Sequence, residues 1–139
     1  MPWNGLAIER IKLPHSLSLL VGWTGRAAST EGLVSQMGQG RHQAEKERFY
    51  QTFLAESQAC LDGLLEACRE EDVRAFREGI TENRRLLQTF ASQMNLVIET
   101  PALAKLCQVA EEVGAVAKSS GAGGGDCGIC FVTEEKEAD

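Results

Sequence analysis

The part of this chain best suited to chemistry is a run of small residues between Lys118 and Cys127, KSSGAGGGDC. Glycine and alanine at positions 121–125 remove side-chain bulk, so backbone N–H groups can approach a ligand closely and converge on it. Lys118, Ser119 and Ser120 would add charge and hydrogen bonds. The pattern favours a loop that binds an anion such as phosphate. A structural turn or a flexible linker is the alternative, and the apolar segments on both sides weigh against the linker.

Other phosphate-binding motifs fit this glycine-rich stretch poorly. A Walker A loop ends in Gly-Lys-Ser/Thr, and neither glycine-rich stretch of the chain has that ending. Residues 123–128 do spell Gly-x-Gly-x-x-Gly, but a dinucleotide site needs this string to leave a strand and open a helix within a βαβ unit. Only eleven residues follow Gly128, which is too few to complete that unit. We therefore interpret the match as accidental.

The cysteines and histidines do not form a metal-binding pattern. Cys127 and Cys130 are three residues apart, so on a strand their side chains point to opposite faces, and no second Cys or His pair lies nearby. His15 and His42 are isolated in the sequence. We expect no metal site and no catalytic histidine. Asn83 interrupts an apolar helical stripe and is interpreted as a satisfied buried amide, with contact to a ligand as the alternative.

The elements that must position the loop begin with two predicted strands. Imperfect alternation of apolar residues predicts one strand over residues 6–13, and a second apolar run predicts another over residues 16–23. The short break at Pro14 favours an antiparallel hairpin between them. A glycine-punctuated turn follows at residues 22–25, and a short helix is predicted from Ser29 to about Met37.

Three longer helices are predicted from apolar positions that recur every three or four residues. The first spans residues 43–68 and the second residues 73–94, with Asp72 as N-cap. Thr100 and Pro101 supply a capping hydroxyl and a first-turn proline for the third, which ends near Gly114. Strands are predicted over residues 115–118 and 128–132. Helices collected between strand pairs indicate an α+β fold, with a mostly antiparallel sheet covered on one face by long helices.

Length and charge narrow the possible functions. The 139 residues suit a single domain over residues 1–133, followed by an acidic tail over residues 134–139, and the net charge is −6. This charge argues against a general nucleic-acid binder. No apolar run is long enough to span a membrane, and the first residues do not read as a secretory signal. We expect a cytoplasmic protein whose five cysteines stay reduced.

Several motifs together resemble the phosphomevalonate kinases of the GHMP kinase superfamily. Residues 21–25, Val-Gly-Trp-Thr-Gly, are similar to a turn characteristic of that family. Residues 81–87 (TENRRLL), 97–103 (VIETPAL) and 118–129 follow in the family's order. The resemblance covers most of the chain, from about Trp3 to Phe131. It implies a ferredoxin-like C-terminal domain in which residues 118–126 form the third conserved motif of GHMP kinases, a glycine-rich loop that lines the active site.

The resemblance also implies an activity and a set of site residues. The reaction would transfer the γ-phosphoryl group of ATP, with Mg²⁺, to (R)-5-phosphomevalonate in the mevalonate pathway of isoprenoid biosynthesis. No catalytic base can be named. The residues expected to bind the substrate are Thr24, Gly25, Lys118, Ser119, Ser120, Gly121, Ala122, Gly123, Gly124 and Asp126.

The sequence departs from the family by what it lacks. The family's N-terminal domain carries a loop of the type Pro-x-x-x-Gly-Leu-Gly-Ser-Ser-Ala for the ATP phosphates, and nothing here matches it. The helix and strand that usually follow the third motif are absent as well. We therefore expect a fragment that is inactive alone and needs the N-terminal GHMP domain as its partner. The alternatives are a stand-alone α+β module that binds a small anion or dimerises, and another GHMP kinase that acts on mevalonate or homoserine.

Overall fold

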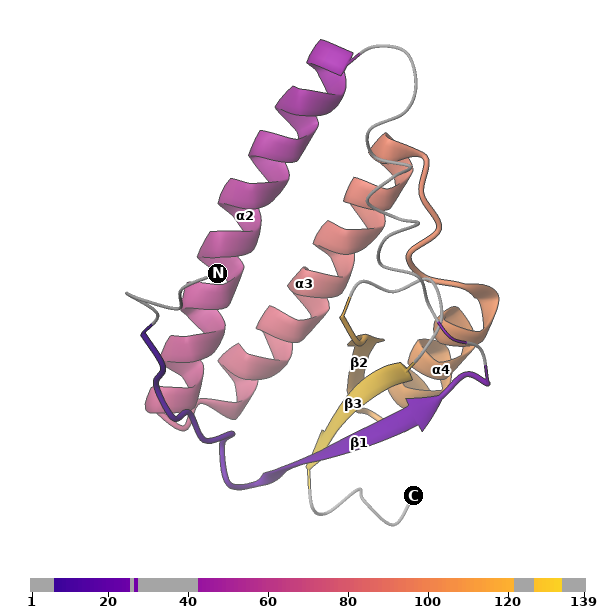
Figure 1. Ribbon diagram of the computed structural model, residues 1–139. Coiled ribbons are helices and arrows are strands. Elements are labelled where there is room, and N and C mark those ends of the chain that lie inside the picture. Colours follow the sequence, from indigo (N-terminus) through magenta and orange to yellow (C-terminus); the bar gives the residue numbers. More distant parts are fainter. Residues whose placement is uncertain (1–6, 26, 28–42, 122–126, 134–139) are drawn as a thin grey trace.

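The computed structural model describes residues 7–25, 27, 43–121 and 127–133 as three helices and three strands (Figure 1). In chain order these are β1 (Leu17–Trp23), α2 (Gln43–Arg69), α3 (Val73–Met94), α4 (Pro101–Glu112), β2 (Val116–Ser119) and β3 (Cys127–Thr133). The predicted α+β class is confirmed. The helix predicted from Ser29 to Met37 and the acidic tail lie outside the described residues.

The helices begin where their capping residues predict. The Asp72 carboxylate accepts a hydrogen bond from the Ala75 N–H at 3.0 Å, and Thr100 accepts one from the Leu103 N–H at 3.3 Å. Both side chains satisfy N–H groups that have no partner within the first turn. After α4, Gly114 has a φ of +80°, the left-handed conformation that the predicted C-terminal glycine requires.

The three strands form one antiparallel sheet in the order β1-β3-β2. In this register Leu19, Phe131 and Val116 are aligned across the sheet, and so are Val21, Ile129 and Lys118. Aligned residues point to the same face, and the two rows are two positions apart on every strand. Both rows therefore lie on the same side of the sheet.

Helices cover both faces of the sheet (Figure 1). The long helices α2 and α3 lie on one side, where the Phe76 ring packs edge-on against Phe131 at 4.9 Å between centroids. The shorter α4 covers the opposite side, where buried Cys107 and Ala110 pack against Ala117 and Val132. The prediction that the long helices cover one face holds for α2 and α3 but is wrong for α4, the third predicted helix, which covers the other face.

Two glycines on neighbouring strands allow α4 to approach the sheet closely. Gly22 and Gly128 are paired across β1 and β3, and both lie beneath the Leu106 side chain. A Cβ at either position would lie within 2.8 Å of a Leu106 methyl carbon. These glycines, which belong to the family-like motifs, are thus explained by packing.

The predicted hairpin between residues 6–13 and 16–23 is wrong. Residues 7–14 form no strand, and β1 pairs with β3 instead. Ile8 is 87% exposed, so the apparent alternation does not reflect a buried face. The segment follows the α2–α3 corner instead, where Glu9 forms an ion pair with Arg69 at 3.2 Å and Leu13 packs against the core. Among the described helices, none is long and apolar enough to cross a membrane.

Candidate functional site

The two segments predicted to bind a ligand lie at the same end of the sheet. Trp23 pairs with Cys127, and Ser119 pairs with Gly128, so β1 and β2 both end beside the start of β3. Thr24–Gly25 and Ser120–Gly121 continue from these ends. With β3 between them, the two strand ends are about 10 Å apart, twice the spacing between strands. Four further predicted residues are outside the described part of the chain: Ala122, Gly123, Gly124 and Asp126.

At this end of the sheet, two glycines adopt left-handed conformations and one backbone N–H already has a hydrogen-bond partner. Gly25 has a φ of +82° and Gly121 a φ of +60°, conformations that glycine adopts without the strain other residues would incur. The Ser120 N–H donates to the Cys127 carbonyl at 2.9 Å, so this donor is already used within the sheet. The bond extends the pairing of β2 and β3 into the loop.

The side chains of Lys118 and Ser119 point to opposite sides of β2. Lys118 shares the α3 side with Val116, because the two residues are two positions apart on the strand. Ser119 shares the α4 side with Ala117 and is only 3% exposed. A ligand held on the α3 side could therefore meet the Lys118 ammonium but not the Ser119 hydroxyl.

Lys118 is a largely buried cation on this side of the sheet. Burial lowers the pKa of its ammonium below the usual range, while the Cys60 and Cys107 thiols act in the opposite direction. None of the ion pairs among the described residues involves Lys118. A buried charge without an opposite charge beside it is costly, and such positions are enriched at binding sites.

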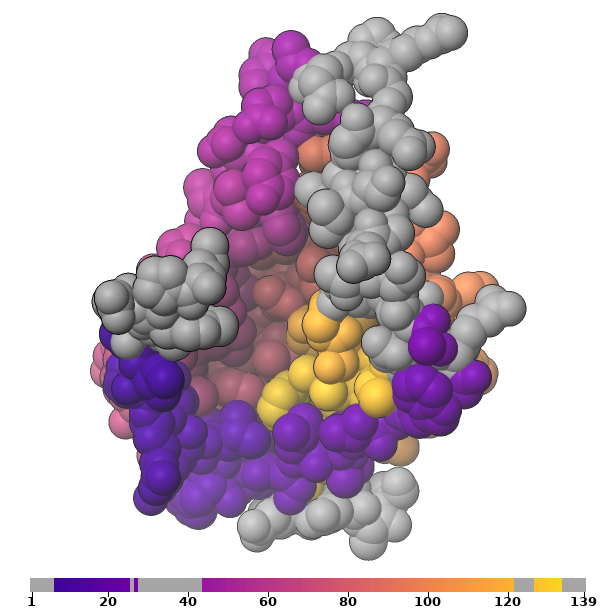
Figure 2. All heavy atoms as spheres, viewed as in Figure 1, coloured from indigo at the N-terminus to yellow at the C-terminus, as the bar shows by residue number. Residues whose placement is uncertain are grey.

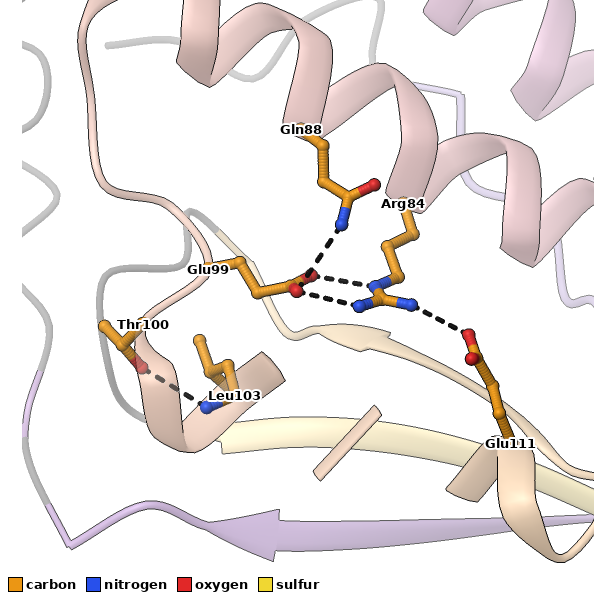
Figure 3. A network of polar contacts seen from close by, with 6 residues as sticks. All are labelled: Arg84, Gln88, Glu99, Thr100, Leu103 and Glu111. Atoms are coloured by element: carbon orange, nitrogen blue, oxygen red, sulfur yellow. Dashed lines mark hydrogen bonds and ion pairs between the residues drawn. The ribbon is translucent and has the colours of Figure 1, made fainter. Parts of the chain in front are cut away.

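A polar network centred on Arg84 supports the end of the sheet (Figure 3). This network was not predicted from the sequence. The guanidinium binds both carboxylate oxygens of Glu99 at 2.8 Å, and its third nitrogen binds Glu111 at 2.8 Å. Gln88 donates to Glu99 at 3.5 Å. These contacts join α3, the segment before α4 and α4 itself. Only the TENRRLL string, whose two arginines are adjacent, hinted at this role.

A cavity of about 340 Å³ lies beside this network. Arg84, Gln88 and Glu99 line it together with Ser119. Two carboxylates already neutralise Arg84, so this cavity does not suit an anion. The partly buried Lys118 is the better candidate for contact with a negative ligand.

The cysteines remain free thiols, and they form no disulfide among the described residues. Cys130 packs on the α4 side of β3, and Cys127 is three residues away on the same strand, so the two point to opposite faces, as predicted. Within the described ranges, no group of three or more His, Cys, Asp or Glu side chains could hold a metal ion.

Comparison with known proteins identifies the family. Residues 64–139, more than half of the chain, match the family described as GHMP kinases C terminal. The chain belongs to the GHMP kinases. A curated relative, the phosphomevalonate kinase of a Streptomyces species, is 39% identical over 140 residues, which are 99% of this GHMP kinase chain and 36% of the relative. The chain thus spans about a third of the length of that relative.

Solved structures agree with this assignment of the GHMP kinase chain. A crystal structure of a Listeria innocua protein superposes with a TM-score of 0.85 and 38% identity, over 99% of this chain and 38% of the other. Phosphomevalonate kinase of Streptococcus pneumoniae, in complex with phosphomevalonate and AMPPNP, superposes with a TM-score of 0.72 and 32% identity. That match covers 88% of this chain and 34% of the pneumococcal chain.

Proposed function

We propose that this chain is the C-terminal part of a phosphomevalonate kinase in the mevalonate pathway. In this reaction a phosphate oxygen of (R)-5-phosphomevalonate attacks the γ-phosphorus of ATP. The bond from that phosphorus to the β–γ bridging oxygen breaks, ADP leaves, and 5-diphosphomevalonate forms. Phosphoryl transfer of this kind depends mainly on positioning and on neutralising charge. The chain would supply part of the acceptor side.

One observation carries the proposal. The phosphomevalonate kinase of Streptomyces matches 99% of the chain at 39% identity, so the likeness extends over both segments proposed to bind the substrate. The pneumococcal enzyme, whose crystals hold phosphomevalonate and AMPPNP, supports the same substrates for this chain. Mevalonate and homoserine are the competing acceptors within the family.

The geometry at the end of the sheet suits an acceptor phosphate. Lys118 would provide positive charge, while Thr24, Gly25, Ser120 and Gly121 border the same end of the sheet. Ser119 would contribute through its backbone only, because its side chain is buried on the opposite face. The proposal also includes four residues that lie outside the described part of the chain: Ala122, Gly123, Gly124 and Asp126.

A partner domain is part of the proposal. Leu19, Val21 and Trp23 point to the α3 side of β1, and between 48% and 63% of each residue is exposed. Three large apolar residues in a row on one strand favour an interaction surface. We infer that the N-terminal GHMP domain is the required partner and that the 139 residues alone have no kinase activity. That domain would also hold ATP and Mg²⁺.

We further propose a cytoplasmic location for the enzyme. The thiols of Cys68 and Cys107 are buried and pack as small apolar side chains in two different clusters. Such use of cysteine is typical of proteins from a reducing compartment.

A chimera tests the proposed activity. The 139 residues replace the matched 140 residues of the Streptomyces kinase, and ADP formation is measured with phosphomevalonate, mevalonate and homoserine as acceptors. We expect turnover with phosphomevalonate only. The matched control is the same chimera with Lys118→Met, which should lose most of its kcat/KM if Lys118 meets the acceptor.

Two results would overturn the proposal. One is a folded, monodisperse chimera that does not use phosphomevalonate. The other is a chimera that prefers mevalonate or homoserine. Activity of the isolated 139 residues with ATP and phosphomevalonate would contradict only the inference that they need a partner domain.

A further inference from the structure

The apolar layer between α3 and β2 ends in two polar residues. Phe76 and Ile80 pack into the same core cluster as Val116. Asn83 follows Ile80 by three positions on α3, and Lys118 follows Val116 by two positions on β2. Since these spacings keep the side chains on the same faces, Asn83 and Lys118 continue the contact between α3 and β2 beyond its apolar part.

Cys60, on α2, joins these two residues. Its thiol donates a hydrogen bond to the Gly79 carbonyl at 3.3 Å. Burial and the negative charge of Glu82 raise the pKa of the thiol, whereas a hydrogen bond from Asn83 and the charge of Lys118 lower it. The carboxamide of Asn83 and the ammonium of Lys118 therefore both lie near the same sulfur, although they come from different elements.

Asn83 and Lys118 can form more hydrogen bonds than the contact with Cys60 uses. A carboxamide has two N–H donors and an oxygen acceptor, and a thiol is only a weak partner for one of them. The Lys118 ammonium has three N–H donors and forms none of the ion pairs among the described residues. Figure 2 shows that this side of the molecule is hollowed between α2 and β3, with α3 visible at the floor of the hollow.

We propose that Asn83 binds the substrate's phosphate together with Lys118, and that Cys60 holds the Asn83 carboxamide in position. This assignment rests on the proposed function for the identity of the substrate, but the anion site itself does not. A phosphate oxygen accepts hydrogen bonds from an ammonium and a carboxamide N–H at once, and the charged donor strengthens the contact. Aspartate at position 83 would place a carboxylate beside the phosphate and repel it.

Protection of the Cys60 thiol tests the site without catalysis. The 139-residue chain is alkylated with iodoacetamide, and modification of each cysteine is followed by mass spectrometry of peptides. Inorganic phosphate and phosphomevalonate should slow alkylation of Cys60 several-fold, whereas mevalonate, which has no phosphate, should not. Cys130, on the opposite side of the sheet, is the internal reference and should react at an unchanged rate.

Variants connect this protection to Asn83. Asn83→Ala and Lys118→Met should each abolish protection by phosphate, and Arg74→Met, which removes an exposed cation of α3, should retain it. Asn83→Leu, which keeps the shape of the side chain without its hydrogen-bonding groups, replaces the alanine variant if thermal melting shows that the alanine variant does not fold. Protection that persists in a folded Asn83 variant would overturn the proposal. So would equal protection by mevalonate, because a carboxylate would then be the bound group.

Kinetics of the Streptomyces chimera provide a second test. Asn83→Ala should raise KM for phosphomevalonate about tenfold with little change in kcat, because a lost ground-state contact affects binding. Asn83→Asp should raise KM further. If KM is unchanged in both variants, the assignment of Asn83 is wrong. An inactive chimera whose Cys60 is still protected by phosphate, in an Asn83-dependent manner, would refute the proposed kinase function while supporting this anion site.

Discussion

The Arg84 guanidinium holds the Glu99 carboxylate by two parallel hydrogen bonds of 2.8 Å, with side chains only 19% and 15% exposed (Figure 3). Arg84→Met leaves the largely buried Glu99 carboxylate without its partner, and breaking such a pair costs more than the pair itself contributes. We expect the free energy of unfolding to fall by about 2–3 kcal/mol, less than for a fully buried pair. Urea denaturation of the 139-residue chain measures this.

An exposed pair on the same helix is the matched control. Arg74 and Glu78 are bonded at 3.0 Å but lie at the surface, so Arg74→Met should cost less than about 0.5 kcal/mol. The double variant Arg84→Met/Glu99→Leu should recover part of the loss, because it removes the unpaired carboxylate. Equal losses for the Arg84 and Arg74 variants would show that the network does not brace α4 against α3.

The same pair predicts how stability depends on pH. The hydrogen bonds from Arg84 are the main cause that lowers the pKa of Glu99 below its ordinary value of 4.5, against the opposing effect of burial. The unfolded chain therefore binds the proton first, so this contribution to stability is complete above 4.5 and is lost as the pH falls through the folded pKa. Glu99→Gln should flatten the acid side of the stability curve. Parallel curves for the two proteins would contradict the pairing.

Two helical glycines should respond to alanine in opposite directions. A Cβ at Gly79 would lie 2.5 Å from a Leu64 methyl carbon at the contact of α2 with α3, whereas a Cβ at Gly63 meets nothing within 4 Å. Gly79→Ala should therefore destabilise the chain by about 1–3 kcal/mol through overpacking. Gly63→Ala should stabilise it by about 0.5–1 kcal/mol, because alanine favours the helix. Thermal melts distinguish the two, and stabilisation by Gly79→Ala would show that Leu64 moves aside freely.

Local signals in the sequence were sufficient for the helices. Asp72, Thr100 and Gly114 each perform the capping role that their residue types predict. A cap acts within one helical turn and needs no tertiary contact, so it can be recognised without the fold.

The sheet could not be predicted in the same way. The pairing of β1 with β3 joins residues more than a hundred positions apart, and no local pattern selects it over the neighbouring segment at residues 6–13. The roles of Gly22 and Gly128 likewise depend on Leu106, which is distant from both in sequence. Neither glycine was among the residues expected to bind the substrate, and both leave space for a leucine side chain.

Two segments of the predicted site lie at the same end of the sheet. Lys118 and the Trp23 turn were expected to lie together, and the register of the sheet brings them to the same end. Two other features depend on where β2 ends. Lys118 and Ser119 point to opposite faces of the strand, and the Ser120 N–H is occupied by a hydrogen bond. From the sequence, the end of β2 could be assigned only to within one or two residues. A shift of one residue is enough to move a side chain to the other face of the sheet.

The buried charge of Lys118 should lower the stability of the folded chain. Its ammonium is largely buried, and this burial lowers its pKa, so the charged form costs stability at neutral pH. Lys118→Met keeps the length of the side chain without the charge. At pH 7 we expect the variant to be more stable by up to about 1 kcal/mol in urea denaturation, while the corresponding chimera loses activity.

The pH dependence of this gain has a defined sign. Because the folded pKa is lower than the ordinary 10.5, the native state loses its proton before the unfolded chain does as the pH rises. The unfolded state then binds more protons, so the stability of the unmodified chain increases with pH between the two pKa values. The advantage of Lys118→Met should therefore shrink in alkaline solution. Lys105→Met, at an exposed position on α4, is the control and should have little effect at any pH. If Lys118→Met destabilises the chain at pH 7, the ammonium is held by native contacts of its own and is not kept in place for an anionic ligand.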